Sequence, residues 1–172
     1  MRKTIHVALA LLCTVLLVGC KTAEQKEAER QQMLAEMNEA AQARNELRKA
    51  YCNSMLCTTG RAYLEAALEE LVPGCEYTVD MEPDGMLLKE EPSEQFSIVV
   101  TDAETARLCF TNFYATIKVD YWNHGVEAEK LCAALLERGI GGRIADGENS
   151  HGNAWLLDAR NGTYEYYQQP GV

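Results

Sequence analysis

The sequence predicts an α+β fold: a long N-terminal helix followed by an antiparallel sheet of about five or six strands, with two short helices. Residues 21–50 contain no Gly or Pro and consist mainly of Ala, Glu, Gln, Lys, Arg and Leu, which favour helix. Residues 113–122 alternate between apolar and polar side chains, as expected of a strand with one buried face. Residues 126–138 carry apolar side chains at helical spacing. Helices and strands are therefore mixed rather than strictly alternating, which is typical of α+β proteins.

The first nineteen residues have the layout of a secretory signal. Arg2 and Lys3 are followed by residues 7–18, which are apolar except for Thr14 and are short for a membrane-spanning helix. The segment ends in Leu17-Val18-Gly19-Cys20, which resembles the signal of bacterial lipoproteins. That resemblance implies cleavage before Cys20 and a lipid on the Cys20 sulfur. We therefore expect three parts: a signal peptide (1–19), a lipidated cysteine with a helical stalk (20–51) and a disulfide-stabilised α+β domain (52–172).

The net charge of the chain and the expected lipid on Cys20 indicate which kinds of partner the protein can bind. The chain carries a formal charge of −10, and because residues 1–19 hold two basic and no acidic residues, the remainder carries −12. An acidic protein repels phosphate backbones, so we expect no nucleic acid partner. Membrane affinity would come from the lipid. Lys21 after the lipidated cysteine resembles the pattern for delivery to the outer membrane, facing the periplasm or the exterior, with the inner membrane as the alternative.

The stalk has few apolar side chains. They follow a loose four-three spacing that Arg44 interrupts, so we expect a solvated helix that packs only towards its end. A partly disordered tether over residues 21–32 and a coiled-coil partner helix are alternatives. The apolar positions are Met33, Met37, Ala40, Leu47 and Tyr51.

Residues 58–110 predict a second helix and several strands. The helix would begin at Thr58 or Thr59, bury Leu64, Ala67, Leu68 and Leu71, and stop at Pro73-Gly74. Strands are expected at 75–81 and 86–89, on either side of the turn at residues 82–85, and at 95–102. A helical turn over 103–110, capped by Asp102, is also expected, with continued strand as its alternative.

The last third predicts a strand, a helix and a hairpin. The strand at 113–122 leads into the helix at 126–138, which would bury Ala128, Leu131, Cys132 and Leu135. Residues 139–153 are read as a polar glycine-rich loop. Strands at 154–159 and 163–168 flank Asn161-Gly162, a strong hairpin signal.

Residues 115–139 resemble a C-terminal stretch of some type IV pilins, in which a strand leads into a short helix whose cysteine closes a disulfide-bounded region. The resemblance implies that Cys132 is this helix cysteine and that Cys109 is the nearest upstream candidate. It also gives an alternative function, a pilin-like subunit or accessory of a surface filament or secretion apparatus. The chain departs from pilins because residues after 20 lack an apolar N-terminal helix with a glutamate near its start.

The cysteine count is odd once the leader and lipid are removed. Of seven cysteines, Cys13 lies in the leader and Cys20 would carry the lipid. In an oxidising compartment the others are disulfide candidates, with at least one left free or paired with another molecule. The favoured pairing is Cys109–Cys132 with one bridge among the other three, although the connectivity stays open. The candidates are Cys52, Cys57, Cys75, Cys109 and Cys132.

One acidic stretch has the spacing of a calcium loop. Asp80, Glu82, Asp84 and Glu91 stand at positions 1, 3, 5 and 12, and a glycine follows at position 6, which resembles an EF-hand loop. Glu at position 3, a proline inside the loop and the prolines that flank it favour an acidic hairpin tip instead. A weak calcium site is the alternative.

Catalytic motifs are absent from the sequence. The histidines after the leader, His124 and His151, have no nucleophile elbow beside them, and there is no Cys-x-x-Cys or second ligand pair for zinc. A thiol-dependent enzyme or redox protein that uses the odd cysteine is the remaining alternative. We therefore expect no catalysis, no cofactor and no resident metal.

Aromatic side chains gather near the C-terminus. Trp155, Tyr164, Tyr166 and Tyr167 lie on the two strands of the predicted hairpin, where alternation separates Tyr164 and Tyr166 from Tyr167. Two interpretations stay open: ordinary packing of a terminal hairpin, or a face that exposes aromatic surface to a protein or a glycan. Nearby polar residues indicate either a cation or sugar site or a solvated loop: Asp146, Glu148, Asn149, Asn153 and Asp158.

These observations predict a lipid-anchored bacterial envelope protein that acts as a structural or protein-interaction module. Its anchor would be the lipid on Cys20, and its partner another envelope protein that contacts the sheet or the stalk.

Overall fold

The computed structural model describes residues 22–122, 124–146 and 153–168. The proposed signal peptide, the lipidation site Cys20 and the candidates Glu148, Asn149 and His151 lie outside these residues. The chain divides into two compact units, Met1–Ala43 and Arg44–Val172. The division falls inside the first described helix, earlier than the boundary expected after Tyr51.

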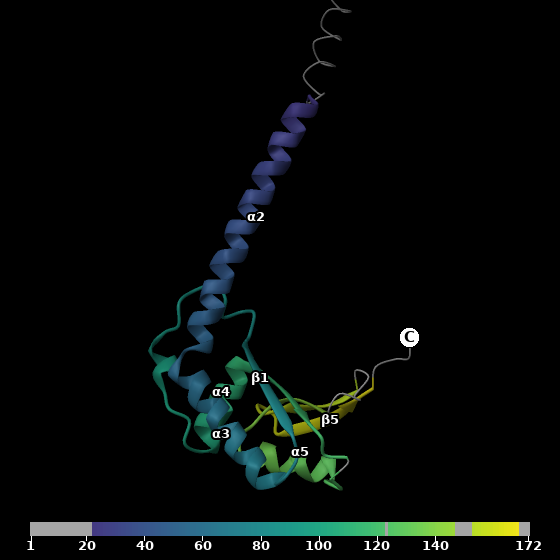
Figure 1. Ribbon diagram of the computed structural model, residues 1–172. Helices are drawn as coiled ribbons and strands as arrows, with labels where there is room; N and C mark the ends of the chain where they lie inside the picture. The colour runs from purple at the N-terminus through teal and green to yellow at the C-terminus, as the bar shows by residue number, and fades with distance from the viewer. Residues whose placement is uncertain (1–21, 123, 147–152, 169–172) are drawn as a thin grey trace, which may run out of the picture. The chain divides into compact units, whose positions relative to one another are not determined.

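The first described helix, α2 (Ala23–Cys52), has 30 residues, which corresponds to about 45 Å at 1.5 Å per residue (Figure 1). Every residue from Thr22 to Glu46 is exposed, including the apolar side chains of Met33, Leu34 and Met37. The expected stalk helix is therefore present, and it includes residues 23–32. Within the described residues, we find no helix with the length and apolar composition needed to cross a membrane.

Helix α3 (Met55–Leu71) follows α2 after a two-residue break. Ser54 caps it, since its Oγ accepts a hydrogen bond from the Cys57 backbone N at 3.3 Å. The expected caps were wrong: the hydroxyls of Thr58 and Thr59 donate to backbone carbonyls of the first turn instead. The predicted apolar stripe is confirmed at Leu64, Ala67 and Leu68, which are buried.

Among the described residues, five strands form one sheet in the order β1-β2-β3-β4-β5. It is antiparallel except for the parallel pairing of β2 with β3, which α5 (Ala128–Glu137) connects. The fold class is therefore α+β as predicted, and the parallel pair is the departure from an all-antiparallel sheet. The strands are β1 (Tyr77–Pro83), β2 (Phe113–Val119), β3 (Gly142–Asp146), β4 (Ala154–Asp158) and β5 (Thr163–Tyr167).

One face of this sheet forms the core with the helices. Strand β2 alternates as predicted, with Phe113, Ala115, Ile117 and Val119 buried. Helices α3 and α5 lie beside the sheet, and α4 (Ala103–Asn112) leads directly into β2 (Figure 1). The predicted cap of α4 is confirmed: Asp102 Oδ1 accepts from the backbone N of Thr105 at 2.9 Å, as part of a capping box.

Two predicted strands are wrong and one strand was missed. Residues 86–89 form turns, and residues 95–102 contain a 3-10 helix, η1 (Glu94–Ser97), followed by chain that joins no sheet. Phe96 is buried there, with its ring centroid 4.9 Å from that of Tyr51. The missed strand is β3, which lies in the segment expected to be a polar loop. Its glycine was taken as a loop signal, yet Gly142 lies directly against Ala115 of β2.

Candidate binding pocket

The aromatic residues of the C-terminal hairpin are arranged by strand register. Trp155 of β4 pairs with Tyr166 of β5, and Leu157 pairs with Tyr164, so Tyr164 and Tyr166 share the face of Trp155. Tyr167 pairs with Ala154 and lies on the opposite face. The predicted separation of Tyr164 and Tyr166 from Tyr167 is confirmed.

The rings of Trp155, Tyr164 and Tyr166 lie on the same face of the sheet as the core residues, at the edge formed by β5. Trp155 also pairs with Ile144 of β3, and Ile144 pairs with the buried Ile117 of β2. The Trp155 ring centroid lies 5.7 Å from that of Tyr164 and 5.1 Å from that of Tyr166. Tyr166 is nevertheless 51% exposed, and β5 is the last strand in the sheet order. The apolar face of the sheet is therefore exposed at this end.

A cavity of about 620 Å³ opens beside these rings. Three segments far apart in the sequence form its walls: the connection from β2 to α5, the end of β3, and the β4–β5 hairpin. The lining residues are Tyr121, Trp122, Gly125, Val126, Glu127, Ala128, Asp146, Asn153, Trp155 and Tyr166.

Backbone hydrogen bonds position the wall between β2 and α5. The Val126 N donates to the Tyr121 carbonyl at 3.0 Å, and the Gly125 N donates to the Trp122 carbonyl at 3.2 Å. Gly125 has φ 68°, a value that favours glycine. The Trp122 N donates to Asp146 Oδ1 at 3.4 Å, which ties this connection to the end of β3. The Trp122 side chain is left 77% exposed at the cavity.

Tyr121 is a buried aromatic residue in the lining of the pocket. Burial raises the pKa of its hydroxyl, and the nearby Asp146 carboxylate raises this pKa further, whereas a hydrogen bond with Trp155 lowers it. Tyr121, Asp146 and Trp155 all line the cavity.

The charge in the pocket is negative. Asp146 and Glu127 are both in its lining, and no Lys or Arg is among the described residues that line it. Glu127 forms an exposed ion pair with Lys130 at 2.8 Å. The pocket thus combines four aromatic rings with two carboxylates.

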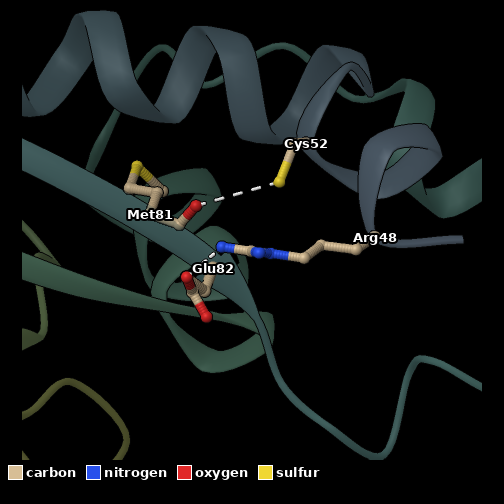
Figure 2. Close-up of polar contacts among 4 residues, drawn as sticks. All are labelled: Arg48, Cys52, Met81 and Glu82. Atoms are coloured by element: carbon tan, nitrogen blue, oxygen red, sulfur yellow. Dashed lines mark hydrogen bonds and ion pairs between the residues drawn. The ribbon is translucent and has the colours of Figure 1, made fainter. Parts of the chain in front are cut away.

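The acidic residues of the alternative calcium site do not form a ligand cluster in the described part of the chain. Glu82 of β1 is paired with Arg48 of α2, and the Cys52 thiol donates to the neighbouring Met81 carbonyl at 3.9 Å (Figure 2). Asp84 Oδ1 accepts from the Met86 N at 2.8 Å, as in an Asx turn. Asp80 and Glu91 complete no cluster, since the described part of the chain holds no group of three or more acidic, His or Cys side chains suited to a metal.

The five described cysteines are free thiols in this structure. The Cys109 Sγ of α4 lies against α3, donating to the Leu56 carbonyl at 3.4 Å, and it interacts electrostatically with Cys57. Burial raises the pKa of Cys57 to about 11 and that of Cys132 to about 12. Disulfide bonding of these residues, including the Cys109–Cys132 pair, stays a prediction.

The remaining candidates divide between the pocket and the surface. Asp146 and Asn153 line the pocket, together with Trp155 and Tyr166. Asp158 instead closes the β4–β5 turn, where Oδ1 accepts from the Arg160 N at 2.8 Å. His124 is exposed. Sequence reasoning missed Tyr121, Trp122 and Glu127; the only available signal was the aromatic pair at the predicted strand end.

Comparisons with known proteins do not assign the chain to a family. No protein-family model matches it, and neither a curated protein nor a solved structure was found to be similar.

Proposed function

We propose that this chain is a lipid-anchored protein of a bacterial envelope that binds another envelope protein through an aromatic surface formed by Trp122, Trp155, Tyr164 and Tyr166. The observation that carries the proposal is the pocket beside β4 and β5, where both tryptophans of the chain lie next to exposed tyrosines.

The composition of this surface suits protein recognition. Tyr and Trp are enriched in interfaces, because they bury much apolar area with few rotatable bonds and keep a polar group for hydrogen bonding. Trp122 and Tyr166 are 77% and 51% exposed. A partner that covers them would remove apolar surface from water, which is favourable.

The position of β5 offers a second mode of contact. It is the last strand of the sheet and all five of its residues are exposed. An extended segment of a partner can add to such an edge through backbone hydrogen bonds while its side chains contact the neighbouring face. Tyr164 and Tyr166 lie on that strand, so strand addition would also cover the aromatic surface.

The N-terminal part of the chain would attach the protein to the membrane. The likeness of Leu17-Val18-Gly19-Cys20 to a lipoprotein signal supports lipidation of Cys20, and Lys21 supports delivery to the outer membrane. Residues 22–46 are exposed and mostly polar, which suits a solvated spacer. The lipid would hold the protein at the membrane, and the domain after the spacer would bind the partner.

The two alternatives have weaker support. Nucleophilic cysteines need a lowered pKa and solvent access, whereas Cys57, Cys109 and Cys132 are buried thiols with raised pKa values. A pilin-like subunit shares the order of helix before sheet. However, pilins keep an apolar N-terminal helix, and the exposed part of α2 is mostly polar.

Capture of the partner with paired variants tests the proposal. Cells would express the full chain with either Tyr166→Ala or Tyr167→Ala, be cross-linked, and yield the lipidated protein for mass spectrometry. The two tyrosines are similarly exposed, at 51% and 46%, but lie on opposite faces of β5. We expect one reproducible envelope protein with the wild type and with Tyr167→Ala, and its loss with Tyr166→Ala. Equal recovery with both variants would contradict the proposed surface.

A further inference from the structure

We infer that the aromatic pocket binds the guanidinium group of an arginine side chain presented by the partner. The inference rests on the proposed function, since it specifies which side chain the aromatic surface recognises.

The walls suit a planar cation. The rings of Tyr121, Trp122, Trp155 and Tyr166 belong to residues that line the cavity. The faces of such rings attract cations, Trp most strongly, and the attraction grows when the site is shielded from water. Arginine also stacks its flat guanidinium on aromatic rings, which the compact ammonium of lysine does not do.

The carboxylates supply the matching charge. Asp146 accepts one hydrogen bond from the Trp122 backbone N, and a carboxylate has acceptor sites for several more. A guanidinium can therefore donate to Asp146 while it stacks on the neighbouring rings, and such charge-assisted bonds are about twice as strong as neutral ones. Glu127 is already paired with Lys130 at 2.8 Å, so Asp146 is the carboxylate that would pair with the guanidinium.

The size and overall charge agree with this ligand. A cavity of about 620 Å³ holds a long side chain together with part of the backbone that carries it. The net charge of −10 favours approach of a basic segment over an acidic one. A neutral or anionic side chain would place no positive charge near Asp146 and Glu127.

The tryptophans provide a specific reporter. The chain has two, Trp122 and Trp155, and both line the pocket, so intrinsic tryptophan fluorescence reports on this site alone. The probes are N-acetyl-arginine amide and N-acetyl-citrulline amide, which have nearly the same shape and differ in the charge of the side chain. We expect a saturable change in emission of the full chain with the arginine probe and none with the citrulline probe.

A matched pair of variants tests the role of Asp146. Asp146→Asn removes the charge and keeps an oxygen for the Trp122 N, and we expect about tenfold weaker binding of the arginine probe, as for loss of one charge-assisted bond. Glu165→Gln makes the same charge change at an exposed position paired with Leu156 on the other face, and we expect no effect.

Two results would overturn the inference: equal responses to both probes, or equal weakening by both variants. Neither would contradict the aromatic surface as a protein contact, because that proposal depends on the capture experiment with Tyr166→Ala and Tyr167→Ala. Loss of selectivity in the capture experiment would instead contradict the proposed function itself.

Discussion

The ring centroids of Trp155 and Tyr166 lie 5.1 Å apart, with an angle of 53° between the ring planes, at directly paired positions of β4 and β5. Cross-strand aromatic pairs of this kind contribute about 0.2–1 kcal/mol to sheet stability. The same two rings line the pocket. One pair therefore stabilises the hairpin and presents the surface that we propose for binding.

The two tryptophans are expected to differ in their contribution to stability, although both are needed for binding. Trp122 is mostly exposed, so Trp122→Ala is expected to change the free energy of unfolding by less than about 0.5 kcal/mol. Trp155 packs against the core and two tyrosines, so Trp155→Ala is expected to cost about 1–3 kcal/mol. Both changes should abolish partner capture. Urea unfolding followed by circular dichroism measures the difference, and equal destabilisation by the two variants would contradict this division.

The close approach of α3 and α4 requires a glycine. A Cβ atom at position 60 would lie 2.3 Å from the Cys109 Sγ. Gly60→Ala is therefore expected to destabilise the domain by about 1–3 kcal/mol through overpacking. Removing the sulfur relieves the clash, so Gly60→Ala with Cys109→Ala should cost less than the sum of the single changes. A strictly additive double mutant, measured by urea unfolding, would show that the two positions are not in contact.

Thiol reactivity should follow burial. Cys57, Cys109 and Cys132 are buried and their pKa values are raised by that burial, so their reactive thiolate forms are scarce near neutral pH. The pKa of Cys52 is also raised, but its side chain is only partly buried. Under reducing conditions, we expect iodoacetamide at pH 8 to label Cys52 well before these three, which should react only after unfolding in urea. Rapid labelling of Cys57 or Cys109 in the folded protein, located by peptide mass spectrometry, would instead support a thiol chemistry.

The Asp102 cap of α4 should make the stability of the folded protein depend on pH. Hydrogen bonds from Thr105, first from its backbone N, lower the pKa of the Asp102 carboxyl below its ordinary value of 3.8. The folded state therefore holds this proton less tightly than the unfolded state. Its stabilisation is present above pH 3.8 and is lost as the pH falls through the lowered value. Asp102→Ala should lower the melting temperature at pH 7 and flatten its dependence on pH below 4. An unchanged slope in thermal unfolding between pH 2 and 5 would contradict this role.

Sequence patterns correctly predicted the helices and strands that are defined by spacing within a single element. The alternation of residues 113–119, the stripe of residues 64–68 and the cap at Asp102 all appear in the structure as expected. Each depends on spacing within one element and on burial of one face. The long N-terminal helix was similarly evident from composition, since it needs no tertiary contact to be recognised.

The missed elements depend on contacts between distant segments. Ile98, Val99 and Val100 suggested a strand, but only Val100 is buried and the described chain gives this segment no strand partner. Strand β3 was not predicted because its glycine was read as a loop signal. Gly142 is required there because a Cβ would lie 2.4 Å from the Ala115 carbonyl oxygen of β2. Sequence spacing carries no information about such approaches.

Only one wall of the pocket, the β4–β5 hairpin, could be predicted from the sequence. Alternation in the hairpin identified the shared face of Trp155 and Tyr166, because it is a property of two adjacent strands. The opposite wall depends on the parallel pairing of β2 with β3, which brings Trp122 to Asp146 across the sheet. Without that pairing, nothing in the sequence linked Trp122 to the hairpin.

Site-specific photo-cross-linking in intact cells tests the aromatic surface most directly. A photo-reactive phenylalanine analogue would replace Tyr166 in one strain and Tyr167 in another, and the cross-linked products would be identified by mass spectrometry. We expect one discrete adduct with an envelope protein from position 166 and a much weaker adduct, or none, from position 167. Equal adducts from both positions, or no adduct from position 166, would contradict binding through this face.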